Sequence, residues 1–74
     1  MTPQQRIYLA TIASESDRLG HAPVLRDLAR ATGRSRGSVH AAIARLRDAG
    51  YVTGRERSLR VTDSGRVALG EQTT

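Results

Sequence analysis

The 74-residue chain contains no cysteine, no lysine, no phenylalanine and no tryptophan. Without cysteine it can form no disulfide, no thiolate metal site and no cysteine nucleophile. Its aromatic residues are Tyr8 and Tyr51, too few for the row of stacking platforms that binds single-stranded nucleic acid. No apolar run reaches the roughly 18 residues of a membrane-spanning helix, and the N-terminus lacks the pattern of a signal peptide. These absences favour a cytoplasmic protein without a membrane partner.

The residue sets that catalysis needs are also missing. The chain has two histidines, His21 and His40, and its seven acids are scattered along the sequence. We find no metal-binding set, no glycine-rich phosphate cradle and no plausible serine–histidine–acid arrangement in so small a core. The sequence therefore predicts that the protein is not an enzyme. It also predicts no cofactor, no metal and no evident small-molecule ligand.

The charge that is present is strongly positive. Twelve arginines face seven acids, which gives a net charge of +5 and a pI of about 11.3. Clustered positive charge displaces counterions from phosphates, so a domain with a pI above about 9 is a candidate for binding nucleic acid. A basic surface with no specific partner explains the charge alone equally well. The length allows one domain with a small core.

The first residues have the pattern of a helix start. Thr2 can cap the helix, Pro3 suits its first position, and Gln5 stands where a capping box needs it. Gly20 is expected to end this first helix. Its predicted buried face comprises Leu9, Ile12, Ala13 and Ser16, with Tyr8 at the flank and Leu19 a turn later.

Two more helices are predicted in the middle of the chain. The second covers residues 25–32 and stops at Gly33, and Ser35 then caps a third that runs to about Ala49 before Gly50. The buried stripe of the second helix is Leu25, Leu28, Ala29 and Thr32. The stripe of the third is Val39, Ala42, Ile43 and Leu46. Two helices joined by a tight turn with glycine are typical of a helix-turn-helix.

After Gly50 the apolar period changes from nearly four to two. Residues 51–53 and 59–61 are predicted strands of a hairpin with Gly54 in its turn, and Thr62 can cap a last short helix over residues 63–69. The predicted fold is mainly α with a small β-hairpin: a three-helix core, a two-stranded wing and a short C-terminal helix. This is a winged helix-turn-helix domain over residues 1–70, followed by a flexible tail at 71–74.

On a helical projection, the third helix presents small residues opposite its buried stripe, framed by polar ones. The outer positions are Gly37, Ala41, Ala44 and Asp48. The framing residues are Ser38 and Arg45 on one side and His40 and Arg47 on the other. Small side chains allow a helix backbone to approach the floor of a DNA major groove. Arg36 in the first turn can bond a guanine edge with two donors, and Ser38 can contact a base or a phosphate.

These segments resemble winged helix-turn-helix bacterial regulators over residues 3–69. "TPQQRIYL" through "GHAPVLRDLA" is similar to the DNA-binding domain of LexA repressors. "VHAAIARLRDAGYV" resembles the recognition helix and first wing strand of GntR-type regulators, and "VTDSGRVAL" resembles the segment after the wing in MarR-type regulators. Because the pattern recurs across several families, it specifies the fold well and the biological role poorly.

The resemblance implies a base-reading helix from Ser35 to about Arg47. The predicted base-reading residues are Ser35, Arg36, Gly37, Ser38, His40, Ala41 and Arg45. The predicted contacts to the DNA backbone or minor groove, wing included, are Arg34, Arg47, Arg55 and Arg57. His40 could equally be a partly buried packing residue or a base contact. Arg45 suits a contact with a phosphate better than one with a base. Arg55 and Arg57 would also fit a solvated hairpin tip.

Three positions depart from the pattern of these families. Val24 stands where the second helix usually has a serine or threonine cap, so that helix end must be satisfied otherwise. Arg34 follows the glycine of the turn, where an apolar residue is common, and Thr32 replaces a leucine before it. These changes should weaken the packing of the turn into the core and leave Arg34 free to meet a phosphate.

The leading hypothesis is a sequence-specific double-stranded DNA-binding protein, a small bacterial or phage transcriptional regulator associated with the nucleoid. The alternatives are a winged-helix module that binds protein and an accessory recombination factor. A homodimer or cooperative assembly on DNA is compatible with the sequence, through the first helix or the last one. A steep fall of binding with salt would separate DNA binding from protein docking.

Overall fold

The computed structural model describes residues 1–55 and 57–70. In chain order the elements are α1 (Pro3–Leu19), α2 (Leu25–Thr32), α3 (Arg36–Asp48), β1 (Val52–Thr53), β2 (Arg60–Val61) and α4 (Asp63–Ala68). The two strands form one antiparallel hairpin. The predicted fold class, mainly helical with a small hairpin, is confirmed. Glu56 and residues 71–74, for which a flexible tail was predicted, lie outside the described residues.

Helix α1 begins and ends as its sequence predicts. The Thr2 hydroxyl accepts from the Gln5 backbone N–H at 3.1 Å, and the Gln5 side chain accepts from the Thr2 N–H at 3.0 Å. This reciprocal pair satisfies N–H groups that a helix start otherwise leaves free. Gly20 ends the helix in the left-handed conformation at φ 74°, which glycine adopts without strain.

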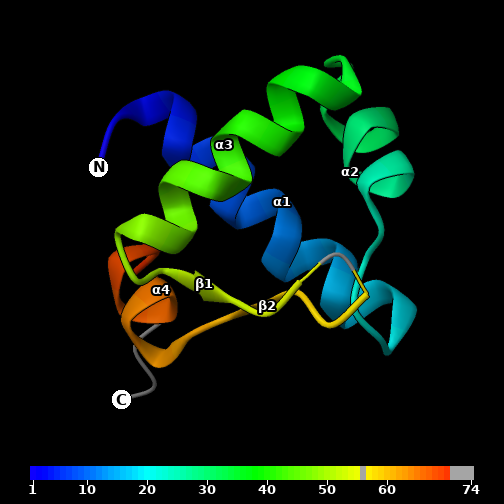
Figure 1. Cartoon of the computed structure of the whole chain (residues 1–74). Coiled ribbons are helices and arrows are strands. Elements are labelled where there is room, and N and C mark those ends of the chain that lie inside the picture. Colours follow the sequence, from blue (N-terminus) through cyan, green and yellow to red (C-terminus); the bar gives the residue numbers. More distant parts are fainter. Residues whose placement is uncertain (56, 71–74) are drawn as a thin grey trace.

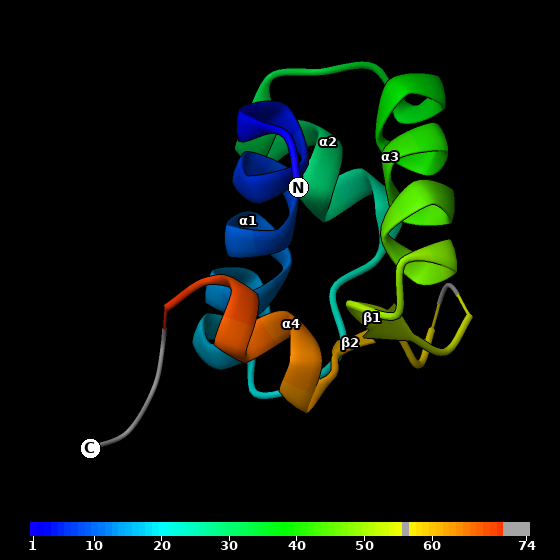
Figure 2. The same cartoon turned by 90° about the vertical axis from the view of Figure 1, so that its left-hand side faces the viewer.

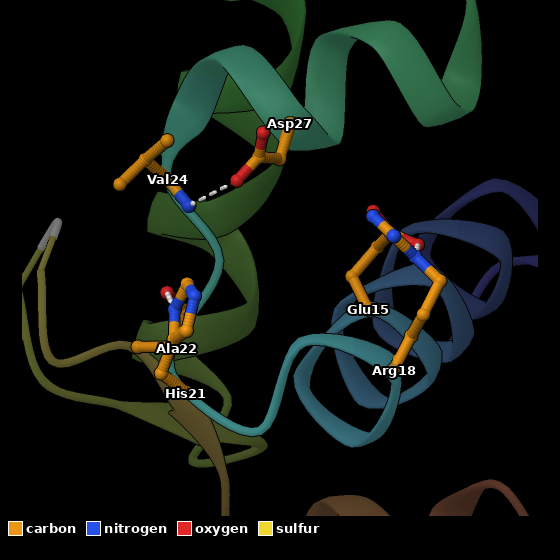
Figure 3. A network of polar contacts seen from close by, with 6 residues as sticks. All are labelled: Glu15, Arg18, His21, Ala22, Val24 and Asp27. Carbon is orange, nitrogen blue, oxygen red and sulfur yellow. Dashed lines mark hydrogen bonds and ion pairs between the residues drawn. The ribbon is translucent and has the colours of Figure 1, made fainter.

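The start of α2 shows how the chain manages without a hydroxyl cap. The Asp27 carboxylate accepts a hydrogen bond of 3.4 Å from the Val24 backbone N–H, as Figure 3 shows. The acid also lies in the first turn of the helix, where negative charge complements the helix dipole. Asp27 therefore stabilises an end that Val24 cannot cap through its side chain.

The turn between α2 and α3 is held by Thr32. Its hydroxyl donates to the Leu28 carbonyl at 2.8 Å and accepts from the Arg34 backbone N–H at 3.3 Å. Gly33 has φ 70°, so the chain reverses at the glycine as predicted. Thr32 is half-buried and Arg34 is exposed. A hydroxyl bridge thus replaces the apolar contact that a leucine would make at this turn.

The core lies where α1, α2 and α3 meet the base of the hairpin (Figures 1 and 2). Its fully buried side chains include Leu9 and Ile12 from α1, Leu28 from α2, and Val39 and Leu46 from α3. These positions belong to the apolar stripes predicted for the three helices. Of the helices in the described residues, none combines the length and apolarity that crossing a membrane requires.

The hairpin, called the wing and spanning residues 52–61, has a shorter ladder than predicted. Val52 pairs with Val61 and Thr53 with Arg60, while Tyr51 and Leu59 lie outside the strands. The Tyr51 N–H donates to the Leu46 carbonyl at 2.9 Å, which closes the end of α3. Because that bond occupies the Tyr51 amide, the first strand begins one residue later than expected.

Helix α4 packs on the base of the wing. The Thr62 hydroxyl accepts from the Gly65 N–H at 3.1 Å and donates to the Gly50 carbonyl at 2.6 Å. Gly65 is buried so closely against the Tyr51 carbonyl and Val61 that a Cβ there would overlap both. The predicted cap at Thr62 is confirmed, and the helix ends one residue before the expected Leu69.

Arg6 joins the two ends of the fold. Its guanidinium donates to the carbonyl of Ala68 at 2.9 Å and to that of Leu69 at 3.1 Å. These are the carbonyls that a helix end leaves without intrahelical partners, and a cation is favourable there. The contact therefore fastens the end of α4 to the first part of α1.

Candidate nucleic-acid interface

The N-terminal turn of α3 is built by two serines. The Ser35 hydroxyl accepts from the Ser38 backbone N–H at 3.1 Å and donates to the Ser38 hydroxyl at 3.1 Å. The bond to the backbone fixes where the helix begins. Arg36 and Gly37, between the two serines, are held in the first turn and remain exposed.

All eleven residues predicted from the sequence to contact DNA are exposed. Eight of them lie at or on α3: Ser35, Arg36, Gly37, Ser38, His40, Ala41, Arg45 and Arg47. Arg34 is in the preceding turn, and Arg55 and Arg57 are in the wing. In Figure 2, α3 and the wing lie on one side of the molecule, and α1 and α4 lie on the other. The predicted residues are therefore carried by elements that share one side of the fold.

The two edges of α3 face different neighbours. On one edge, His40 and Arg47 line a groove of about 570 Å³ between α2, α3 and the wing, together with Arg55. On the other edge, Ser38 and Arg45 line a hollow beside the first turn of α1. The exposed face of α3 is thus bordered by the wing on one side and by α1 on the other.

Two predictions for α3 need correction. His40 is exposed, so the alternative of a partly buried packing residue is wrong. Ala44 is half-buried, although the helical projection placed it on the outer face. Gly37 and Ala41, in the first half of α3, are the small residues of the outer face that are exposed.

The structure adds one arginine that the sequence analysis did not select. Arg26, in the first turn of α2, lines a hollow together with Arg36 from α3 and Arg57 from the wing. Three positive side chains from three elements thus surround one small space. The sequence shows Arg26 in a helix start, but its proximity to Arg36 and Arg57 depends on how the helices pack, which periodicity does not reveal.

Arg55 and Arg57 of the wing differ from the neighbouring Arg47 of α3 in what they contact. Arg55 and Arg57 are exposed, and no described side chain forms an ion pair with either. Arg47 instead reaches from the last turn of α3 to the wing, where its Nε and Nη2 donate to the Gly54 carbonyl at 3.3 and 2.9 Å. The structure thus brings Arg47 to the wing and leaves Arg55 and Arg57 to solvent.

The ion pairs of the described residues lie on the opposite side of the molecule. Glu15 pairs with Arg18 within α1 at 2.8 Å, and Asp17 of α1 pairs with Arg66 of α4 at 3.7 Å. Arg18 donates two hydrogen bonds to the Glu15 carboxylate, as Figure 3 shows, and these bonds hold the pKa of that carboxyl below its ordinary value. The same contact raises the pKa of Arg18.

Positive charge is therefore left unneutralised on the side of α3 and the wing. Residues 1–55 and 57–70 contain no ion pair involving an arginine of α3 or of the wing. They also contain no cluster of three or more histidine, cysteine or acidic side chains that could hold a metal. A positively charged face with small residues at its centre is suited to binding a polyanion such as a nucleic acid.

A helix-turn-helix with a wing and a basic outer face defines the class of winged-helix nucleic-acid-binding domains. A model of the MarR family matches residues 1–59, which is most of the chain. The chain therefore belongs to the MarR family, whose winged-helix members are DNA-binding transcriptional regulators. The match confirms the MarR family, although the segment whose sequence resembled MarR-type regulators, residues 61–69, lies outside the matched range. The likenesses to LexA and GntR-type regulators remain resemblances.

A solved structure shares the fold. The hypothetical protein SSo2273 from Sulfolobus solfataricus is similar with a TM-score of 0.83 and 20% sequence identity. The match covers 96% of this chain and 54% of that protein, so the chain spans about half the length of its structural relative. No curated protein matches the chain.

Proposed function

We propose that the protein binds double-stranded DNA in a sequence-specific manner, with α3 in the major groove and the wing on the backbone or in the minor groove. The observation that carries this proposal is the separation of charge. One ion pair lies within α1 and the other joins α1 to α4, whereas the arginines of α3 and the wing have no acidic partner among the described residues. DNA phosphates would supply the missing negative charge.

Within this proposal the residues at the start of α3 select the sequence. Arg36 is the guanine-reading residue, because its position in the first turn of a recognition helix reaches base edges. Gly37 and Ala41 allow the helix backbone to approach the groove floor. Ser35, Ser38 and His40 contact bases or phosphates beside them.

A second set of residues fixes the protein on the duplex. Arg34, Arg55 and Arg57 are exposed arginines beside the helix, and they contact phosphates or the minor groove. Arg45 belongs to the same set by position and charge, whereas the guanidinium of Arg47 is bonded to the Gly54 carbonyl of the wing. Arg26 joins it because it shares a hollow with Arg36 and Arg57.

The proposal extends to self-association. MarR-family regulators usually act as dimers. Ile7 on α1 and Val67 on α4 are the large apolar side chains most exposed to solvent, at 60% and 57%. We assign the dimer surface to this pair of helices, on the side of the molecule away from α3 and the wing.

The dependence of binding on salt tests the proposed function directly. If about four to six phosphates are contacted, the logarithm of the affinity for duplex DNA should fall linearly with the logarithm of salt concentration, with a slope of about −4 to −5. Fluorescence anisotropy with a labelled duplex and the matching single strand measures this slope. A flat response, or equal binding to the single strand, would favour a protein-docking module instead.

A further inference from the structure

The wing has little of its own to hold it in place. Its ladder joins two residues to two, and a hairpin this short is not stable by itself in water. Val52 and Leu59 anchor its base, since both side chains are 2% exposed. The described residues beyond that base, namely Gly54, Arg55, Arg57 and Ser58, need another contact if the wing is to have a defined direction.

Arg47 supplies that contact. Two N–H groups of its guanidinium, on Nε and Nη2, donate to the single carbonyl oxygen of Gly54. The guanidinium is planar and rigid, so two bonds to one oxygen fix the direction of the carbonyl as well as its distance. The bond connects the last turn of α3 with the first residue after β1.

The turn that follows Gly54 is internally braced. The Arg55 N–H donates to the Ser58 hydroxyl at 3.1 Å, and the Ser58 N–H donates to the Arg55 carbonyl at 2.9 Å. Gly54 has φ 90°, and a Cβ there would overlap the Ser58 backbone. The Gly54 carbonyl and the Arg55 N–H belong to one planar peptide group, so fixing the direction of the carbonyl also orients the start of Arg55.

We propose that Arg47 is a positioning residue that holds the wing against α3, so that Arg55 and Arg57 meet DNA at a set distance from the base-reading helix. Its role in binding then runs through the wing rather than through a phosphate of its own. This inference rests on the DNA-binding function proposed above. The hydrogen bond itself can be tested without DNA.

Trypsin digestion tests the contact in the free protein, because Arg55 and Arg57 are cleavage sites in the wing. Arg47→Met removes the donors and keeps a long side chain, and Arg45→Met removes another exposed arginine from the same helix. Cleavage after Arg55 and Arg57 should rise about tenfold in Arg47→Met, equivalent to about 1.4 kcal/mol of local opening. It should not change in Arg45→Met, and equal cleavage in wild type and Arg47→Met would overturn the proposal.

A conservative substitution separates hydrogen-bond geometry from charge. Arg47→Lys keeps the positive charge but lacks the planar pair of donors. Its wing should be cleaved at a rate closer to Arg47→Met than to wild type. Wild-type cleavage would show that charge alone holds the wing and would overturn the argument from geometry. Thermal melting confirms that each variant is folded, and Arg47→Gln replaces Arg47→Met if the latter is not.

A double-mutant cycle tests the role in binding. Arg47→Met and the pair Arg55→Ala/Arg57→Ala should each weaken binding to a duplex, and the triple variant should bind about as well as the pair alone. If the losses multiply, Arg47 contacts DNA independently and the proposal is wrong. If wild type binds no duplex, the proposed function fails, while the cleavage result still decides whether Arg47 holds the wing.

Discussion

Gly37 occupies a position that the free protein does not explain. It lies in the first turn of α3 without a positive φ, and a Cβ added there would meet only the Ser35 hydroxyl oxygen, at 3.9 Å. Glycine inside a helix costs up to about 1 kcal/mol relative to alanine. Neither packing nor backbone geometry therefore requires it. Under the proposed function, the absent side chain is what allows the helix backbone to lie close to DNA.

Gly37→Ala should therefore change stability and binding in opposite directions. We expect the melting temperature to rise, by an amount equivalent to about 0.5–1 kcal/mol, and the affinity for duplex DNA to fall about tenfold. Calorimetry and anisotropy on the same sample measure both. Ser14→Ala, an exposed site on α1, is the control that should leave the affinity unchanged. Unaltered DNA binding by Gly37→Ala would contradict a close approach of this turn.

Residues whose partners are near in sequence could be predicted, and those with distant partners could not. Thr2, Ser35 and Thr62 cap their helices through bonds to residues three positions ahead, so their roles are visible in the sequence. Arg47 donates to the Gly54 carbonyl beyond the end of α3, and Arg26 lines a hollow together with arginines from two other elements. Such contacts depend on the packing angles of helices, which local patterns leave undetermined.

At the scale of elements, α3 and the wing carry different tasks in the proposed complex. The stripes of α1, α2 and α3 were predicted from periodicity because burial of one helix face recurs at regular spacing. The wing was predicted in outline but with strands one residue too long. There the amide of Tyr51 bonds to α3 rather than to a strand, a competition that alternation of apolar residues does not show.

Selection from a random duplex pool should separate these two tasks. Arg36→Ala should flatten one or two positions of the selected motif, since a lost guanine contact costs about 1–3 kcal/mol at one base pair. Arg55→Ala/Arg57→Ala should weaken specific and non-specific binding together and leave the motif nearly unchanged, because phosphate contacts carry no direct sequence information. If the wing variant rewrites the motif and Arg36→Ala does not, the wing reads the sequence instead.

At the scale of the whole molecule, the fold separates two surfaces. The ion pairs and the exposed apolar residues Ile7 and Val67 lie on α1 and α4, whereas the arginines of α3 and the wing have no acidic partner among the described residues. Under the proposed function, two copies could therefore associate through one surface while both basic faces remain open to DNA.

The double variant Ile7→Asp/Val67→Asp should prevent that association. Burying like charges opposite each other is unfavourable, so sedimentation equilibrium should show a monomer at concentrations where wild type dimerises. Ala31→Asp, which adds a charge at an exposed position of α2 outside this surface, serves as the control and should leave the dimer intact. If the wild type is monomeric at all concentrations, with or without DNA, the assignment of this surface as a dimer interface is wrong.

The bond from Arg6 to the end of α4 has a consequence for the order of folding. It joins residues 62 and 63 positions apart, whereas the helix caps and the wing ladder join near neighbours. Closing so long a loop costs entropy that short-range contacts avoid, so docking of α4 should follow the rate-limiting step. Arg6→Met should then speed unfolding roughly three- to tenfold and leave the folding rate unchanged. Stopped-flow kinetics in urea measure both rates, and slower folding would place this contact in the transition state.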